Sequence, residues 1–326
     1  ESLPGWNRNL CAVGGSGMAF FNIVTGIERG FINREAGARR VLKAVDFLLN
    51  KAERFHGAYP HWIDGQTGKA IQFEPKNDAA DILETSFLAM GLLLAREYFD
   101  GDNPQEKELR EKANTIWESI EWDWFGRKRD DGTSVIYWCW SPRYKWEMDL
   151  QCQGFNECQM LYLLSLASPT HSLPDEYYWE GWQPKGFAKK YTKHGVELDL
   201  ALAYRISLFP AHYSYMGLDP KQIAHQGKPY SEILKNWCLA QYRYVETRKE
   251  DFVGYDSALW GITASLNKYG YSAHAPDHDD NGTMAPTASL SSMPYLPEES
   301  KAALLEMFTE HGKKLWGPFG FYDSFN

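Results

Sequence analysis

Carboxylates that can act as acids or bases gather at the start of one predicted helix. In the segment KNDAADILETSF, Asp78, Asp81 and Glu84 are spaced by three residues, so successive members lie near one another along a helix face. Asp78 is expected to cap the helix, whereas Asp81 and Glu84 fall in its first turns. Each of these two is either an acid that faces a cleft or a charge that suits the helix dipole. The pattern leaves both interpretations open.

Glu157 repeats this arrangement in a second segment, residues 154–171. Asn156 can cap a helix there, an apolar stripe follows, and Pro169 ends it. Glu157 therefore falls in the first turn of the helix expected at 154–167, as a catalytic acid or as a charge at the positive end of the dipole. Two inner helices that present carboxylates from their N-terminal ends would supply the acid and the base that glycoside hydrolysis needs.

Histidines and aromatic rings, many of them on three long loops, are candidates for binding a sugar. The loops span residues 55–73, 122–149 and 171–197, and loops on a rigid scaffold usually carry function. Planar rings with polar edges stack on sugars, whereas a single histidine is more often a satisfied structural residue. The candidate substrate-binding residues are His56, His61, Trp62, Trp138, Trp140, Trp146, His171, His212, Tyr215 and Trp260.

The composition favours a protein with a large core and a neutral ligand. The 326 residues are 44% hydrophobic, and 13 Trp and 19 Tyr are more rings than a core needs, so some must line surfaces or clefts. The net charge of -9 argues against nucleic acid or an anionic membrane surface as a partner. The sequence has no run of 18 apolar residues, so no membrane span is expected.

Motifs for metals and cofactors do not appear in the sequence. The five cysteines are widely spaced and form no C-x-x-C pair, which indicates neither a zinc site nor a disulfide framework. Residues 277–282 match the opening of an EF-hand loop, but its twelfth position is Ala288 where a glutamate should bind calcium. G-x-S-x-G, P-loop, dinucleotide and H-E-x-x-H motifs do not occur either. We expect no metal and no cofactor.

Two alternating kinds of helix must position these residues. Apolar helices are expected at 16–28, 81–99 and 154–167, and helices with one charged face at 33–52 and 104–122. Since each apolar face must be covered, the alternation indicates an inner ring of helices wrapped by an outer ring. Further helices are expected at 199–218, 231–248 and 297–313, with short apolar pieces at 256–266 and 283–292.

We therefore predict an all-α fold, an (α/α)6 toroid with long aromatic loops. It forms a single catalytic domain over residues 1–326, with more than half of the residues helical.

A series of longer runs supports this fold. They are GGSGMAFFNIVTGIERGFINRE, RFHGAYPHWIDGQTGK, NDAADILETSFLAMGLLLAREYFDGDN, WSPRYKWEM, GFNE with SPTH, FPAHYSYMGLDP, WGITAS, GTMAPTASLSSMPY and LWGPFGFYDSFN. In this order, and over nearly the whole chain, they resemble the glucoamylase-like family of bacterial proteins. That family includes the β-1,2-glucanases of glycoside hydrolase family 144.

The resemblance implies an (α/α)6 toroid that hydrolyses neutral β-1,2-glucan or sophoro-oligosaccharides with inversion and without a cofactor. It also implies export, to the periplasm or the outer membrane, and we expect a monomer. Glu157 in the G-[FY]-N-E motif is the expected general acid, and the D-x-x-E motif adds Asp81 and Glu84. The closing G-F-Y-D-[AS]-F motif adds Asp323, so water is activated by Asp81, Glu84 or Asp323.

Two other functions remain open at this point. The first is a catalytically weak glycan-binding protein on the same scaffold, which is supported by Leu266, since relatives usually have an aspartate after T-A-S. The second is a polysaccharide lyase, because toroids host lyases too. Lyases act on acidic sugars, and the charge of -9 counts against that substrate.

Overall fold

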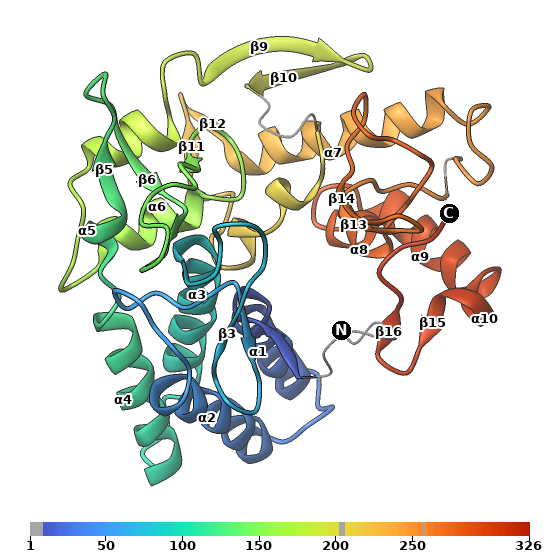
Figure 1. The fold of residues 1–326 in the computed structure, drawn as a ribbon. Helices are drawn as coiled ribbons and strands as arrows, with labels where there is room; N and C mark the ends of the chain where they lie inside the picture. The colour runs from blue at the N-terminus through green and yellow to red at the C-terminus, as the bar shows by residue number, and fades with distance from the viewer. Residues whose placement is uncertain (1–8, 202–205, 257) are drawn as a thin grey trace. The chain divides into compact units, whose positions relative to one another are not determined.

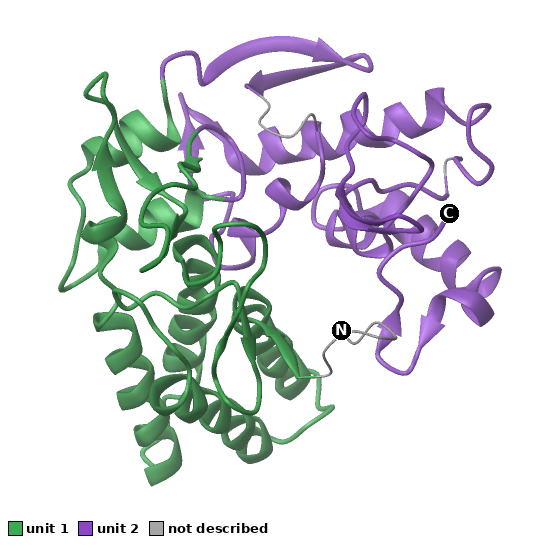
Figure 2. Ribbon diagram, in the orientation of Figure 1, with its two compact units in different colours: residues 1–153, 158–184 green, residues 154–157, 185–326 purple. Residues whose placement is uncertain are grey.

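The described chain divides into two compact units. The computed structural model describes residues 9–201, 206–256 and 258–326 (Figure 1). Unit 1 comprises residues up to Gln153 together with Cys158–Pro184, and unit 2 comprises Gly154–Glu157 and Lys185–Asn326 (Figure 2). The single domain over 1–326 stays a prediction.

Four long helices form the framework of unit 1. They are α1 (Val13–Glu28), α2 (Arg34–Asn50), α3 (Ile82–Tyr98) and α4 (Pro104–Glu118). α1 packs on α3, and α2 packs on α4. α1 and α3 are predominantly apolar, whereas α2 and α4 each carry a charged face, so the expected alternation is confirmed in this unit.

Side-chain caps fix where two of these helices begin. Asn33 caps α2 as predicted, because its Oδ1 accepts the Ala36 N–H at 2.8 Å. Asp81 caps α3 by accepting the Glu84 N–H at 3.0 Å. The prediction that Asp78 is the cap is therefore wrong. The chain before Asp81 is extended, since β4 (Ala80–Asp81) pairs with β7 (Cys139–Trp140), and the helix begins only after this pairing ends.

The remainder of unit 1 consists of shorter elements, many of them in the aromatic loops. Its other helices are α5 (Trp122–Phe125), α6 (Gln159–Ala167) and a π-helical turn at Tyr178–Trp182. One sheet joins β1 (Leu10–Ala12), β2 (Trp62–Asp64) and β3 (Ala70–Ile71), and another joins β5 (Gly126–Lys128), β6 (Ser134–Tyr137) and β8 (Gln151–Cys152). These strands hold the loops in place.

The start of α6 differs from the prediction. Gly154 adopts a left-handed conformation with φ of 81°, and residues 157–158 form a turn, so the helix begins at Gln159 with Cys158 as its N-cap. Asn156 is therefore not the cap, and Glu157 precedes the helix instead of lying in its first turn.

Unit 2 contains fewer long helices and several hairpins. Its helices are α7 (Tyr230–Thr247), α8 (Pro286–Ser291), α9 (Pro297–Thr309) and α10 (Gly312–Leu315), with 3-10 turns at Phe209–Ala211 and Ser214–Met216. The hairpins pair β9 (Ala188–Lys193) with β10 (Val196–Leu200), β11 (Ala224–His225) with β12 (Lys228–Pro229), β13 (Ala264–Asn267) with β14 (Gly270–Ala273), and β15 (Trp316–Gly317) with β16 (Gly320–Phe321). The predicted helices at 231–248 and 297–313 correspond to α7 and to α9 with α10.

The predicted helix at 199–218 is wrong. Its first residues end β10, residues 202–205 lie outside the described chain, and the remainder contains only the two 3-10 turns as helical elements. Fewer than half of the described residues are helical, because loops and hairpins take the rest, so the predicted helical majority is wrong as well. Helices nevertheless remain the main elements. Within the described residues, no helix is both long and apolar enough to cross a membrane.

Candidate active site

The predicted acids of unit 1 form a buried cluster with a histidine. The Asp81 side chain is fully buried, and its Oδ2 lies 2.9 Å from Nδ1 of His61. A carboxylate only accepts hydrogen bonds, so the imidazole is the donor. Nε2 of the same ring lies 3.9 Å from Oε1 of Glu84, whose side chain is 16% exposed. His61 thus lies between the two carboxyl groups that the D-x-x-E spacing brings together.

The charges in this cluster shift one another's pKa values. Burial raises the pKa of the Glu84 carboxyl above 4.5, and the negative charge of Asp81 adds to this effect, whereas His61 and the Gly14 N–H oppose it. Burial alone would lower the pKa of His61, but Glu84 and Asp81 outweigh it and raise this pKa above 6.5. A carboxyl with a raised pKa is a stronger base once ionised, which is the property a general base needs.

Other contacts hold the three side chains in place. Asp81 also accepts the Glu84 N–H at 3.0 Å and the Asn77 amide at 3.4 Å. The His61 ring stacks on Phe73 with centroids 3.7 Å apart, and the ring of Trp62 meets it edge-on at 5.9 Å. The predicted residue His61 is therefore next to the acids, and the predicted residue Trp62 contacts the His61 ring.

A second group of rings in unit 1 includes the predicted Trp140 and Trp146. His56 stacks on Trp124 at 3.7 Å and meets Trp140 edge-on at 4.7 Å. Trp146 lies 6.2 Å from Trp124, and the guanidinium of Arg127 lies 4.6 Å from its ring. Trp140 pairs with Ala80 across β4 and β7, so these rings begin one residue from Asp81.

Two predicted residues of unit 1 lie outside these groups. The backbone carbonyl of Trp138 accepts the Ile82 N–H at 2.9 Å, which ties this half-buried residue to the first residue of α3. His171 is 37% exposed, and its Nδ1 lies 3.1 Å from Asp123, which is 53% exposed. The structure therefore gives His171 a surface contact with Asp123 and does not bring it to the acids.

Glu157 is a buried acid of unit 2. The residue is 5% exposed, and its backbone carbonyl accepts the Ser214 hydroxyl at 2.8 Å. Phe155 anchors the same segment, because its ring packs at 4.3 Å from Trp237 on α7. The backbone around Glu157 is thus fixed by an aromatic contact and a hydrogen bond, although no helix surrounds it.

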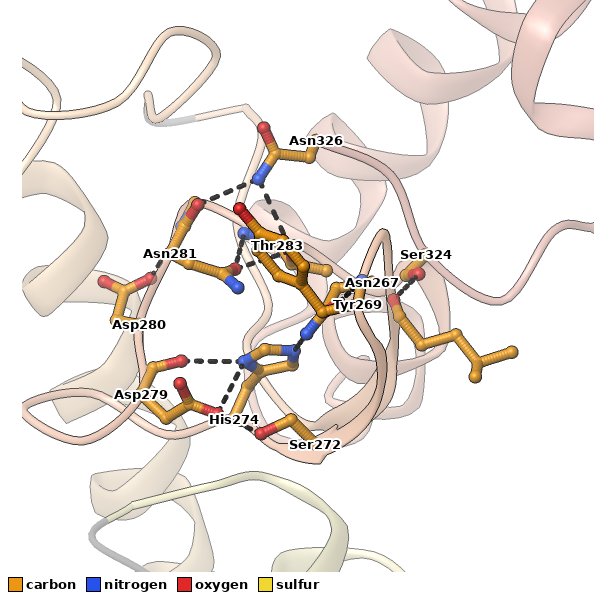
Figure 3. Close-up of polar contacts among 12 residues, drawn as sticks. Asn267, Tyr269, Ser272, His274, Asp279, Asp280, Asn281, Thr283, Ser324 and Asn326 are labelled. Atoms are coloured by element: carbon orange, nitrogen blue, oxygen red, sulfur yellow. Dashed lines mark hydrogen bonds and ion pairs between the residues drawn. The ribbon is translucent and has the colours of Figure 1, made fainter.

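Asp323 belongs to a hydrogen-bonded region at the end of the chain. Its Oδ2 accepts the Leu266 N–H at 2.8 Å, and the Ser324 hydroxyl donates to the Leu266 carbonyl. Asn326 donates to the carbonyl of Asn281 at 2.8 Å in the same region (Figure 3). These contacts attach the G-F-Y-D-[AS]-F motif to β13 through the N–H and the carbonyl of Leu266. The backbone of this leucine, not its side chain, therefore positions Asp323.

Of the remaining predicted residues of unit 2, Trp260 is buried, whereas His212 and Tyr215 are half-buried. Trp260 is 2% exposed, lies in the apolar core and donates its indole N–H to the Glu299 carbonyl at 3.3 Å, which supports a structural role and not sugar contact. Burial lowers the pKa of His212 to about 4, and its Nε2 lies 3.1 Å from the Ser292 hydroxyl. The ring of Tyr215 packs at 6.0 Å from Tyr230.

The described residues offer no obvious metal site. No cluster of three or more His, Cys, Asp or Glu is arranged to hold an ion in that part of the chain. In the loop that resembles an EF-hand, Asp280 instead accepts the hydroxyls of Tyr244 and Tyr255 at 2.7 and 2.6 Å. This aspartate therefore serves the packing of two buried tyrosines.

Several residues of these groups were not predicted from the sequence. Phe73 and Trp124 stack on the two histidines, and Glu121 Oε2 lies 2.8 Å from Nδ1 of His56. Gly14 donates its N–H to Oε2 of Glu84 at 2.9 Å. Phe73 and Trp124 lie in the aromatic loops, so the high aromatic content of these loops could have indicated both residues as candidates. Gly14 is 70 residues from its partner, and no local pattern indicates that contact.

Comparisons with known proteins identify a family and several relatives of this chain. The family model described as "Glycoamylase: Putative glucoamylase" matches residues 149–326. An exo β-1,2-glucooligosaccharide sophorohydrolase (non-reducing end) from Parabacteroides distasonis is 39% identical over 346 residues, which cover 100% of this chain and 47% of that protein. The chain thus spans about half the length of this curated relative.

Solved structures give a similar result. The endo-β-1,2-glucanase from Chitinophaga pinensis, in complex with sophorotriose and glucose, is 41% identical and has a TM-score of 0.92 over 100% of this chain and 78% of its own. The β-1,2-glucanase from Parabacteroides distasonis is 38% identical, with a TM-score of 0.91 over 98% of this chain and 48% of its own.

Proposed function

This chain belongs to the Glycoamylase family, and from that membership we propose that it is a glycoside hydrolase acting on β-1,2-glucan or sophoro-oligosaccharides. The observation that carries the proposal is the pair of carboxyl groups at the start of α3, the buried Asp81 and the half-buried Glu84, whose pKa is raised. They occupy the positions of the family's D-x-x-E acids. Relatives at 38–41% identity are described as β-1,2-glucanases, and one was solved with a β-1,2-linked trisaccharide.

We assign the general acid to Glu157 and the general base to Glu84. In an inverting reaction, the base takes a proton from water as the water oxygen bonds to the anomeric carbon. The bond from that carbon to the leaving oxygen breaks, and the acid protonates this oxygen. The buried position of Glu157 and the family motif around it support the first role. The raised pKa of Glu84 supports the second.

The other two acids have contacts that suit orientation better than proton transfer. Asp81 accepts hydrogen bonds from His61, Asn77 and the Glu84 backbone, so both of its carboxylate oxygens already have partners that fix its orientation. Asp323 accepts the Leu266 N–H. We propose that Asp81 orients His61 beside Glu84 and that Asp323 hydrogen-bonds the substrate.

The aromatic group of unit 1 is the proposed sugar-binding surface. Trp140 and Trp146 adjoin the partly exposed Trp124, and a stacked ring contributes on the order of 1 kcal/mol to binding. A neutral glucan fits rings better than an acidic polymer does, because the chain carries a net charge of -9.

Product analysis tests this function. The protein is incubated with β-1,2-glucan, with other neutral glucans and with polyuronates, and reducing ends and ultraviolet absorbance are followed. Reducing ends released from β-1,2-glucan alone are expected. Unsaturated products from a uronate would show a lyase, and binding without turnover would show a glycan-binding protein.

A single substitution tests the general acid. Glu157→Gln keeps the side-chain shape but cannot donate the proton, so turnover should fall about a hundred- to ten-thousand-fold while the melting temperature and glucan binding change little. Near-normal hydrolysis by this variant would contradict the assignment.

We also propose the (α/α)6 toroid, export from the cytoplasm and a monomeric state. The alternation of apolar α1 and α3 with amphipathic α2 and α4 supports the toroid. Export rests on the family resemblance, and secretion of the native protein would test it. Light scattering of the purified protein would test the monomer.

A further inference from the structure

The first turn of α1 contacts the carboxyl group that we assign as the base. Gly14 donates its N–H to Oε2 of Glu84 at 2.9 Å, whereas Oε1 lies 3.9 Å from Nε2 of His61. Val13, the residue before Gly14, donates its N–H to the carbonyl of His61 at 3.1 Å. The start of one helix therefore holds both the carboxyl group and the backbone of the neighbouring histidine.

A glycine is needed at position 14 because Glu84 occupies the space of a side chain. A methyl group on Gly14 would overlap Oε2 of Glu84, and it would lie 3.1 Å from Cδ of Glu84 and 3.2 Å from the Phe87 ring. Gly15 is exposed, and a methyl group there would meet nothing closer than the Ala12 Cβ at 3.5 Å. Of these two adjacent glycines, Gly14 alone is tied to the acid.

Two further glycines fix how closely α1 approaches α3. A methyl group on Gly17 would overlap the Phe87 carbonyl, and one on Gly91 would overlap the Gly17 carbonyl. The two backbones are thus in direct contact one turn after Gly14. This contact prevents α1 from shifting to make room for a larger residue at position 14, so the flexible end of Glu84 has to move instead.

The helix start also affects the charge on Glu84. The first N–H groups of a helix carry partial positive charge, which stabilises a nearby carboxylate. The Gly14 N–H accordingly lowers the pKa of Glu84 against the larger effect of burial. Its loss would therefore raise this pKa further.

We propose that Gly14 is a positioning residue for the proposed hydrolysis. It binds Oε2 of Glu84 and so fixes the carboxyl group in the orientation in which Oε1 accepts the proton of the attacking water. The proposal rests on the base role assigned to Glu84 above. It adds the α1 N-terminus to the residues on which the rate depends.

Gly14→Ala tests this proposal, with Gly15→Ala as the matched control. For Gly14→Ala we expect kcat on a β-1,2-gluco-oligosaccharide to fall about ten- to a hundred-fold, because a displacement of about 1 Å in a catalytic group has effects of that size. KM should stay within about twofold, since the contact to sugar is unchanged. The acid limb of the kcat profile should move to higher pH, because the Gly14 N–H no longer lowers the pKa of Glu84. Gly15→Ala should match the wild type in kcat, in KM and in the acid limb of the kcat profile.

A double variant separates positioning from folding. Glu84→Asp shortens the side chain by one methylene and leaves room for a methyl group at position 14, so adding Gly14→Ala to Glu84→Asp should reduce kcat much less than Gly14→Ala does alone. If Gly14→Ala fails to fold but the double variant folds and has the kcat of Glu84→Asp, the steric coupling between position 14 and the Glu84 side chain is shown. If neither folds, Gly14 serves packing alone and the proposal is overturned.

The remaining outcomes distinguish this proposal from the function on which it rests. If the wild type is active and Gly14→Ala has the same kcat and the same acid limb as Gly15→Ala, the positioning role is refuted. The proposed hydrolase function is not affected by that result. A folded wild type with no activity on any β-1,2-glucan would refute the function, and the positioning role with it.

Discussion

Replacing His61 tests whether the acid cluster is held by charge. The His61→Gln variant removes the donor to Asp81 and the positive charge beside Glu84. His171→Gln is the matched control, because it also breaks a histidine-aspartate pair in unit 1, with Nδ1 3.1 Å from Asp123. The two pairs have nearly the same length and differ in exposure.

The exposure of each histidine-aspartate pair determines how much unfolding free energy we expect its variant to lose. In the pair of His61 with Asp81, the side chains are 17% and 0% exposed, and removal of one partner from such a pair costs about 3–5 kcal/mol. Asp81 keeps the donors from Glu84 N at 3.0 Å and Asn77 at 3.4 Å, so we expect the lower end, about 3 kcal/mol. His171 and Asp123 are 37% and 53% exposed, so we expect a cost of about 0–1 kcal/mol there.

The pH dependence gives the experiment its second readout. The pKa of His61 is raised in the folded protein, so its stabilising effect is complete below the unfolded value of 6.5 and is lost as pH rises through the folded value. Urea unfolding of both variants and the wild type near pH 6 and near pH 9 should show a His61→Gln deficit that shrinks at the higher pH. The reasoning would be refuted if the two variants lost the same unfolding free energy, or if the loss caused by His61→Gln grew with pH.

Two further predictions concern an ion pair and the tryptophans. Hydrogen bonds from Arg34 lower the pKa of Glu106 to about 2, so this stabilisation is present above pH 4.5 and is lost as pH falls toward 2. Glu106→Gln should cost roughly 2 kcal/mol at neutral pH in urea unfolding and little near pH 2. Trp146→Ala should weaken β-1,2-glucan binding about fivefold in calorimetric titration with a near-normal melting temperature. Trp260→Ala, in the core, should instead cost about 3–5 kcal/mol of unfolding free energy.

The elements that could be predicted from the sequence are those with local signals. Asn33 and its apolar spacing predicted α2, and Pro104 predicted the start of α4. The false helix at 199–218 shows the opposite case. The run VELDL at Val196–Leu200 alternates buried and more exposed residues as a strand does, and this period-two signal was missed because apolar residues continue after it.

The candidate site was predictable only in part, for a related reason. Asp81 and Glu84 are three residues apart, so helical geometry alone brings them together. His61 is 20 residues from Asp81, and its place between two carboxyl groups depends on the pairing of β2 with β1 and on the Val13 contact at the start of α1. A sequence shows that a histidine is present, but burial between two acids is a property of the packed chain.

Asp81 shows why the capping and functional interpretations of an acid are not alternatives. Its Oδ1 accepts the Glu84 N–H and so starts α3, while its Oδ2 accepts from His61. The cap fixes the first turn of the helix, and this turn carries Glu84, so the same carboxylate orients the proposed base and the histidine beside it. An acid at a helix start is therefore both a structural and a functional residue when its second oxygen has a buried partner. The experiment that separates the two effects has to alter that partner and leave the cap in place, as His61→Gln does.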